Sequence, residues 1–177
     1  MKAYALLLLT LASLCLPGLP AHANEPVDER AMKAAYLYNF ALFAQWPNLP
    51  DTDFQLCVLG DTPLDAELER LEGKPVQNGL PIAMRRIMPG DALSGCQLLY
   101  VDERNRRTLD ALLQRLAGSP VLTITDASGL ADRGIMIEMR KQGQRIVFDV
   151  NLAAARRARL DFSARLLKLA SFVADRS

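Results

Sequence analysis

The chain has 177 residues, of which 50% are hydrophobic and 23% are charged, with 21 basic and 20 acidic side chains. This length suits one compact domain with a buried core. The balanced charge argues against a general nucleic-acid-binding protein, which needs an excess of Lys and Arg on one face.

The first 23 residues have the features of a signal peptide. Lys2 provides a positive start, residues 3–16 form a nearly unbroken apolar run, and residues 17–20 contain the helix breakers Pro and Gly. The sequence Ala-His-Ala before position 24 is a small-x-small cleavage site, so we expect cleavage after Ala23 and export of residues 24–177 to the periplasm. Lys2 is the only charged residue removed, so the exported chain has a net charge of zero.

Two other fates of the N-terminal segment stay open. The segment could remain attached as a membrane anchor, although its apolar run is short for a membrane span. A lipid could also be attached at Cys15. Leu14 precedes that cysteine, whereas lipid attachment needs a small residue there.

Cleavage also changes the chemistry that the chain can perform. His22 is the single histidine, so the exported chain has no imidazole for a catalytic pair or a His-based zinc site. Cys15 is lost as well, which leaves Cys57 and Cys96. An even number of cysteines in an oxidising compartment predicts one disulfide, with two buried thiols as the alternative.

Residues 28–46 are predicted to form a helix, with Asp28 as its N-cap and Pro47 ending the pattern. Apolar side chains surround most of this helix, so it must be buried on more than one side. It is therefore either a central core helix or a helix with one face in the core and the other on a partner.

The remaining chain alternates between strands and helices. Strands are predicted at 54–59, 82–87, 97–101, 120–125, 135–139 and 145–150. Helical segments are predicted at 63–73, 102–118, 128–132, 151–157 and from Ser163 through Val173. This alternation predicts a layered α/β domain with a largely parallel sheet flanked by helices. The short turn at 141–143 predicts a C-terminal β-hairpin followed by helices, which makes the sheet mixed.

Few motifs suggest chemistry. Gly60 and Asp61 follow a strand, where α/β folds bind ligands, but no glycine-rich phosphate loop follows them. Asp126 also ends a strand, and we expect it to cap the next turn rather than act as a catalytic group. Cys96 would need a base to act as a nucleophile. The residues therefore predict no catalytic, cofactor-binding or metal-binding site.

A basic stretch lies near the C-terminus. Its arginines are Arg156, Arg157, Arg159 and Arg165. Such a stretch is either a solvated helix face or a surface for an acidic partner.

Several segments, taken together, resemble the YfiR/HmsC-like family of periplasmic proteins. These segments are 33–40 with 45–47, 56–60, 95–100, 121–126 with the stretch to 137, and 148–157 with the stretch to 167. The resemblance implies a regulator that acts by binding and is not an enzyme. It would hold the periplasmic part of a membrane-bound diguanylate cyclase inactive, and its release would raise cyclic di-GMP and promote biofilm growth.

The resemblance carries further implications. The family's cysteine pair matches Cys57 and Cys96, whereas a second pair found in some members is absent from this chain. The family pattern also suggests a homodimer, and other sensors such as histidine kinases are further candidate partners. The expected partner-binding residues are Tyr36, Phe40, Phe43, Arg156 and Arg157.

Two rival functions are considered. One is a periplasmic receptor for a small molecule in a crevice near Gly60 and Asp126. The other is an enzyme that works through carboxylates alone, for which the sequence offers no converging pair.

Overall fold

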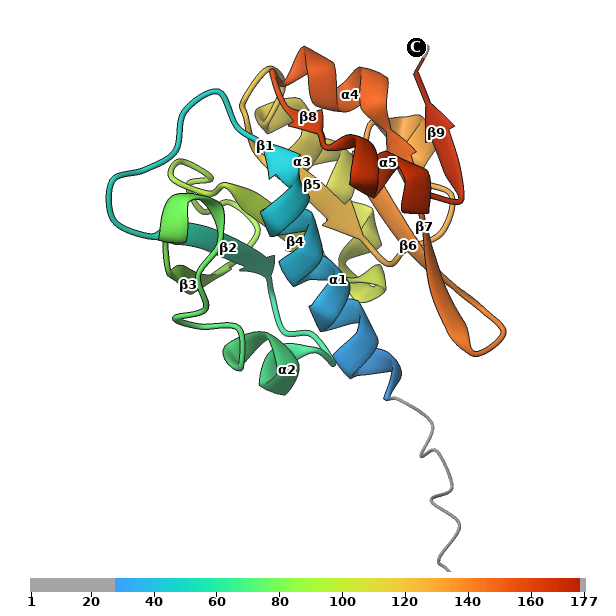
Figure 1. Ribbon diagram of the computed structural model, residues 1–177, viewed down its shortest axis with the longest axis horizontal. Coiled ribbons are helices and arrows are strands. Elements are labelled where there is room, and N and C mark those ends of the chain that lie inside the picture. Colours follow the sequence, from blue (N-terminus) through green and yellow to red (C-terminus); the bar gives the residue numbers. More distant parts are fainter. Residues whose placement is uncertain (1–27, 176–177) are drawn as a thin grey trace, which may run out of the picture.

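The computed structural model describes residues 28–175, in which strands and helices alternate around one central sheet (Figure 1). The predicted signal peptide, with its cleavage site after Ala23, lies outside the described residues. Within residues 28–175 no helix is both long enough and apolar enough to cross a bilayer.

The sheet has seven strands in the order β3-β2-β4-β5-β6-β7-β9. Their bounds are β2 (Phe54–Leu59), β3 (Ile82–Ile87), β4 (Leu98–Val101), β5 (Leu122–Thr125), β6 (Ile137–Gln142), β7 (Arg145–Asn151) and β9 (Phe172–Ala174). All neighbours from β3 to β6 are parallel, β6 and β7 form an antiparallel hairpin, and β9 is parallel to β7. The predicted mixed, largely parallel α/β sheet is confirmed.

Within residues 28–175, five α-helices surround the sheet. They are α1 (Glu29–Phe43), α2 (Asp65–Glu69), α3 (Leu109–Arg115), α4 (Leu152–Arg157) and α5 (Ala164–Leu169). Side chains cap three of them: Asp28 accepts from the Arg30 N–H, Asn151 from that of Ala154, and Ser163 from that of Leu166. Each cap satisfies an N–H group that the first helical turn leaves free.

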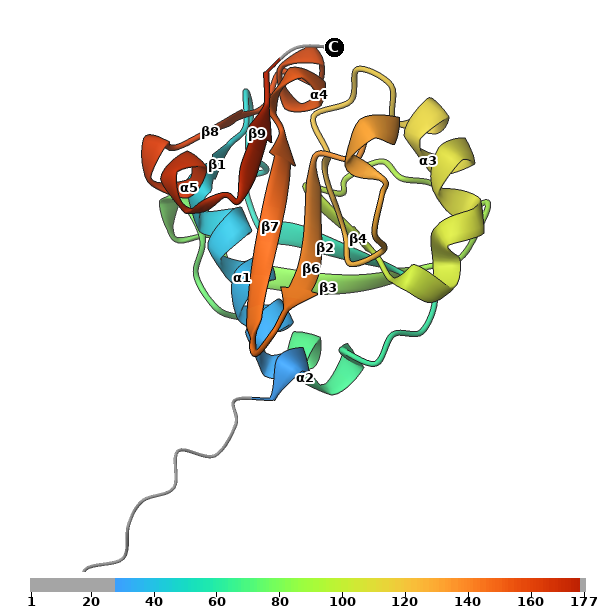
Figure 2. The ribbon, with the colours of Figure 1, turned by 90° about the vertical axis from the view of Figure 1, so that its right-hand side faces the viewer.

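Two apolar cores lie on opposite faces of the sheet. The larger core joins α1, α2, α4 and α5 to the sheet, and the smaller core joins α3 to the other face. Figure 2 shows α1 and α5 on one side of the strands and α3 on the other. Because successive side chains of a strand point to opposite faces, Leu56 and Val58 enter the larger core while Cys57 and Leu59 enter the smaller one.

The C-terminal helix is the largest error of the sequence prediction. It was expected from Ser163 through Val173, but α5 ends at Leu169 and the next residues form strand β9. Phe172 pairs with Asp149 of β7, so β9 provides backbone partners along an edge that β7 would otherwise leave open. This long-range pairing prevailed over the helical spacing of the apolar side chains.

The first helix also ends earlier than predicted. It stops at Phe43 because the next two residues form β1 (Ala44–Gln45), which pairs with β8 (Asp161–Phe162) in a separate two-stranded sheet. The sequence pattern did not predict either of these short strands.

Glu138 ties the loop after β5 to the sheet. This side chain on β6 is buried, and its carboxylate oxygens accept N–H groups from Gly129 (2.9 Å), Leu130 (2.7 Å) and Ala131 (2.8 Å). Three hydrogen bonds to one charged acceptor offset the cost of burying the carboxylate.

We expect Glu138→Ala to lower the free energy of unfolding by about 2–4 kcal/mol, because three backbone donors lose their acceptor. Glu138→Gln keeps one carbonyl oxygen and should lose less. Urea unfolding followed by circular dichroism measures both changes. Glu72→Ala, at an exposed position, is the control, and equal losses in Glu138→Ala and Glu72→Ala would contradict this role of Glu138.

Candidate functional site

The aromatic residues of α1 do not all reach the surface. Phe40 is fully buried, and its ring centroid lies 5.0 Å from that of Phe148 on β7. Phe40 therefore belongs to the core, and its expected role in partner binding is wrong. Tyr36 is half-buried, with its hydroxyl donating to the Ile146 carbonyl at 3.1 Å. The side of α1 that carries Tyr36 and Phe40 therefore packs mainly into the core.

Phe43, at the end of α1, does contribute to the surface. It is half-buried, and the guanidinium of Arg165 on α5 lies 5.2 Å from its ring centroid, within the range of a cation–π interaction. Leu169 lies four residues after Arg165, on the same side of α5, and is 64% exposed. We call Phe43, Arg165 and Leu169 the α1–α5 patch.

Arg156 and Arg157 are both exposed on α4, but they point to different surroundings. Arg156 forms an ion pair with Asp175. Arg157 lines a cavity together with residues of α3, which covers the opposite sheet face from α1. Arg157 therefore lies beside α3, whereas Phe43 of α1 lies beside α5.

At the carboxyl ends of the parallel strands, charged side chains form ion pairs with one another. Lys33 of α1 donates to Asp126 at 2.7 Å and lies 3.0 Å from Glu29, which in turn pairs with Lys141 of β6. Asp126 also accepts the Glu103 N–H at 3.0 Å, so it links α1 to the segment after β4. The prediction that Asp126 caps the turn after β5 is therefore wrong.

This arrangement shifts the pKa of Lys33. Burial disfavours its charge, but the hydrogen bonds and charges of Asp126 and Glu29 outweigh burial and raise the pKa of Lys33 above 10.5. Tyr100 lies in the same region, and its burial, together with the charges of Asp126 and Asp102, raises the pKa of its hydroxyl. Both groups therefore keep their protons at neutral pH.

The space next to Gly60 is filled by protein. A Cβ added there would lie 3.3 Å from the Asn105 amide, which donates to the Leu59 carbonyl, and Arg104 donates to the Asp61 carbonyl. Three cavities of residues 28–175 are lined by other segments. The space that the receptor hypothesis assigns to a ligand next to Gly60 is therefore occupied by the Asn105 side chain.

The predicted disulfide between Cys57 and Cys96 is confirmed. The two residues have Cα atoms 5.8 Å apart and lie in the smaller core, where both are buried. A guanidinium nitrogen of Arg85 lies 3.1 Å from the Cys96 sulfur and also donates to the Ser94 carbonyl at 2.8 Å. In the chain-entropy model, closing a loop of this length contributes roughly 3–4 kcal/mol.

Exposed apolar side chains are the feature that the sequence did not reveal. Leu169 and Phe172 are 64% and 61% exposed, although the sequence pattern placed this segment in an amphipathic helix. Among residues 28–175, no three His, Cys, Asp or Glu side chains gather in a way that could hold a metal ion. The α1–α5 patch and its neighbours instead expose apolar groups, an aromatic ring and arginines.

The fold is a largely parallel α/β sheet flanked by helices, with Leu169 and Phe172 exposed near its C-terminal edge. A family model described as YfiR/HmsC-like matches residues 30–171, which is most of the chain. The protein belongs to the YfiR/HmsC-like family of periplasmic regulatory proteins, as the resemblance in its sequence predicted.

We expect Lys33→Gln to lower the free energy of unfolding by roughly 2 kcal/mol at neutral pH, because Asp126 then stays largely buried without its cation. The raised pKa of Lys33 adds stability that is fully present below pH 10.5 and is lost as the pH rises through the folded-state pKa. The difference between the two proteins should therefore shrink above pH 10.5. Urea unfolding at a series of pH values measures it.

Lys141→Gln, at a more exposed partner of Glu29, is the matched control and should change stability far less. A difference between wild type and Lys33→Gln that grows above pH 10.5 would contradict this account.

Proposed function

We propose that the protein is a periplasmic repressor of a membrane-bound diguanylate cyclase, or of a similar membrane sensor. It binds the periplasmic part of that sensor and holds it inactive, which lowers cyclic di-GMP in the cell and restrains biofilm formation. The observation that carries this proposal is the family match over residues 30–171. The predicted signal peptide supports the location that the proposal requires.

Repression of this kind needs only differential affinity. Moving a two-state sensor from mostly active to mostly inactive takes roughly 5 kcal/mol, and a docking surface can supply this without a reactive group. The state of the carboxylates supports a role in binding rather than catalysis. Asp126 pairs with Lys33, Asp102 pairs with Arg104, and Glu138 accepts backbone N–H groups.

The α1–α5 patch is the surface that we propose for this contact. An aromatic ring, an arginine stacked on it and an exposed leucine are adjacent there, and aromatic and arginine side chains dominate the energetics of protein interfaces. Tyr36, Arg156 and Arg157 remain proposed partner-binding residues outside the patch. The proposed homodimer is a separate matter that light scattering of the purified protein tests.

We expect Leu169→Asp to abolish repression, so that cyclic di-GMP rises to the level that we expect when the gene is deleted. A buried carboxylate at the interface would cost far more than the lost apolar contact. Met88→Asp is the matched control, because Met88 is also exposed (56%) but follows β3 at the opposite edge of the sheet from β9. The readout is the cellular cyclic di-GMP concentration, with thermal melting of each variant as the check of folding.

The partner itself is tested by co-purification. A neighbouring gene for a membrane protein with a GGDEF-type output domain would supply the periplasmic segment to be used. We expect this segment to retain the wild-type protein and Met88→Asp but not Leu169→Asp. The proposal fails if the two proteins do not associate and deletion of the gene leaves cyclic di-GMP unchanged.

A further inference from the structure

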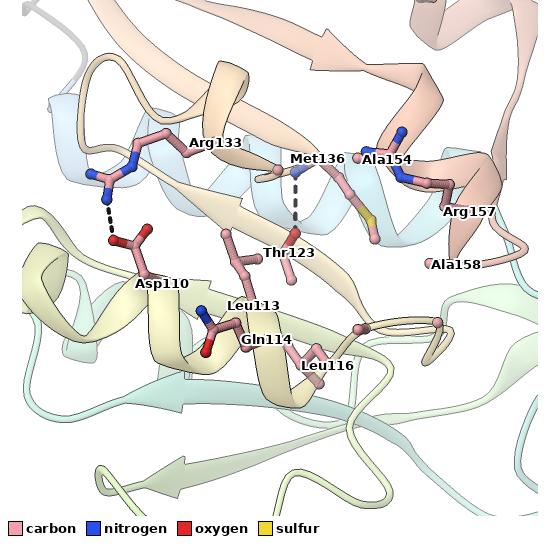
Figure 3. Close-up of a pocket in the computed structure, with 13 residues that line it drawn as sticks. Asp110, Leu113, Gln114, Leu116, Thr123, Arg133, Met136, Ala154, Arg157 and Ala158 are labelled. Carbon is pink, nitrogen blue, oxygen red and sulfur yellow. Dashed lines mark hydrogen bonds and ion pairs between the residues drawn. The ribbon is translucent and has the colours of Figure 1, made fainter. Parts of the chain in front are cut away.

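A cavity of about 480 Å³ lies between α3, the segment that leads into β6, and α4 (Figure 3). We call these apolar lining residues the floor: Leu113, Leu116, Met136, Ala154 and Ala158. The uncharged polar residues Gln114 and Thr123 line the cavity as well. The volume falls within the range of small-molecule sites. The cavity lies between α3 and α4, and no residue of the α1–α5 patch lines it.

The cavity exists because small residues line it where larger ones would fill it. Ala154 and Ala158 present only methyl groups from α4. Gly134 has a φ of 105°, a backbone conformation that disfavours other residues, and a Cβ there would lie 3.8 Å from Leu113. The cavity is therefore left open by the small side chains of Ala154 and Ala158 and by Gly134, whose backbone conformation favours glycine.

Thr123 lines the cavity but is almost fully buried, and its hydroxyl oxygen is already used as an acceptor. The hydroxyl of Thr123 accepts the N–H of Met136 at 3.1 Å, as the dashed line in Figure 3 shows. The occupant that this floor favours is an apolar body, because a polar one would exchange its hydrogen bonds with water for contacts with methyl and methylene groups.

The charges are arranged at the rim. In Figure 3 Arg133 and Arg157 lie at opposite ends of the cavity, and Arg133 is paired with Asp110. Within residues 28–175 Arg157 forms no ion pair, although it is exposed at the cavity. One carboxylate against two guanidinium groups leaves a net charge of one positive unit, and this charge is at Arg157.

We propose that this cavity binds a small amphipathic monoanion, with an apolar body on the floor and a carboxylate on Arg157. One free cation matches one negative charge, and the apolar floor matches an alkyl or aromatic body. This inference goes beyond the proposed repressor function, because the anion would bind to this protein whether or not the sensor is present.

Calorimetry with short alkyl carboxylates tests the proposal on the purified, disulfide-bonded protein. Octanoate should bind roughly tenfold more tightly than hexanoate, because two more methylene groups leave water. Octanoate should also bind about fivefold more tightly than octanamide, which has the same body without the charge. Equal affinity for octanoate and octanamide would overturn the proposal.

Two neighbouring arginines provide a matched pair of variants. Arg157→Gln should weaken octanoate binding about fivefold and leave octanamide binding unchanged, whereas Arg156→Gln, whose side chain does not line the cavity, should change neither. Both residues are exposed, so neither substitution should prevent folding. Equal effects of the two substitutions on octanoate binding would show that general surface charge, and not this site, attracts the anion.

The position of the ligand can be read from methionine methyl groups by NMR. Octanoate should shift the methyl resonance of Met136 on the floor and leave that of Met88, which lies after β3, unchanged. A shift at Met88 without one at Met136 would place the ligand elsewhere and overturn the proposal. Because none of these measurements involves the sensor, failure here is distinguishable from failure of the repressor function.

Discussion

The packing of α1 across one face of the parallel sheet is the contact on which most of the molecule depends. Phe40 is fully enclosed by this contact and meets Phe148 of β7, while Lys33 at the other end of the helix is tied to Asp126 after β5. The helix is thereby attached to β7 and to the end of the central strand β5. The last residue of the helix, Phe43, lies against Arg165 of α5. The α1–α5 patch therefore forms because α1 packs on the sheet next to α5.

Charged groups near the sheet are paired with one another, whereas the groups that are free to bind a partner lie on the surface. At the carboxyl edge of the sheet, where many α/β proteins bind ligands, carboxylates and cations already pair with one another. The groups left with unused binding capacity are on the outside: the exposed Leu169 of the patch and Arg157 at the cavity beside α3. The proposed docking function is consistent with this arrangement. An interior whose polar groups are hydrogen-bonded or paired is rigid, and it supports surface groups that can bind a partner.

Local signals in the sequence predicted much of this structure. Asp28 and Ser163 were expected to start helices and do so, since a capping side chain contacts N–H groups only a few residues away. Strands β2 and β3 were predicted with their observed bounds. For β2 the reason is that a buried parallel strand is a short, mostly apolar run. The C-terminal segment could not be predicted in the same way. Phe172 is in a strand because β7 offers it an edge, and that edge is remote in the chain.

The sequence by itself determined the alternation of strands and helices, the cysteine pair Cys57 and Cys96 of the predicted exported chain, and the resemblance to the family. Each of these depends on residue types and on spacing along the chain. Only the tertiary structure decided which side chains face outward. Phe40 and Phe43 are three residues apart on one helix, yet one is enclosed by β7 and the other lies under a guanidinium at the surface. Exposure depends on what packs from distant parts of the chain, and so the cavity beside Arg157 and the patch at Leu169 appeared only once the chain was folded.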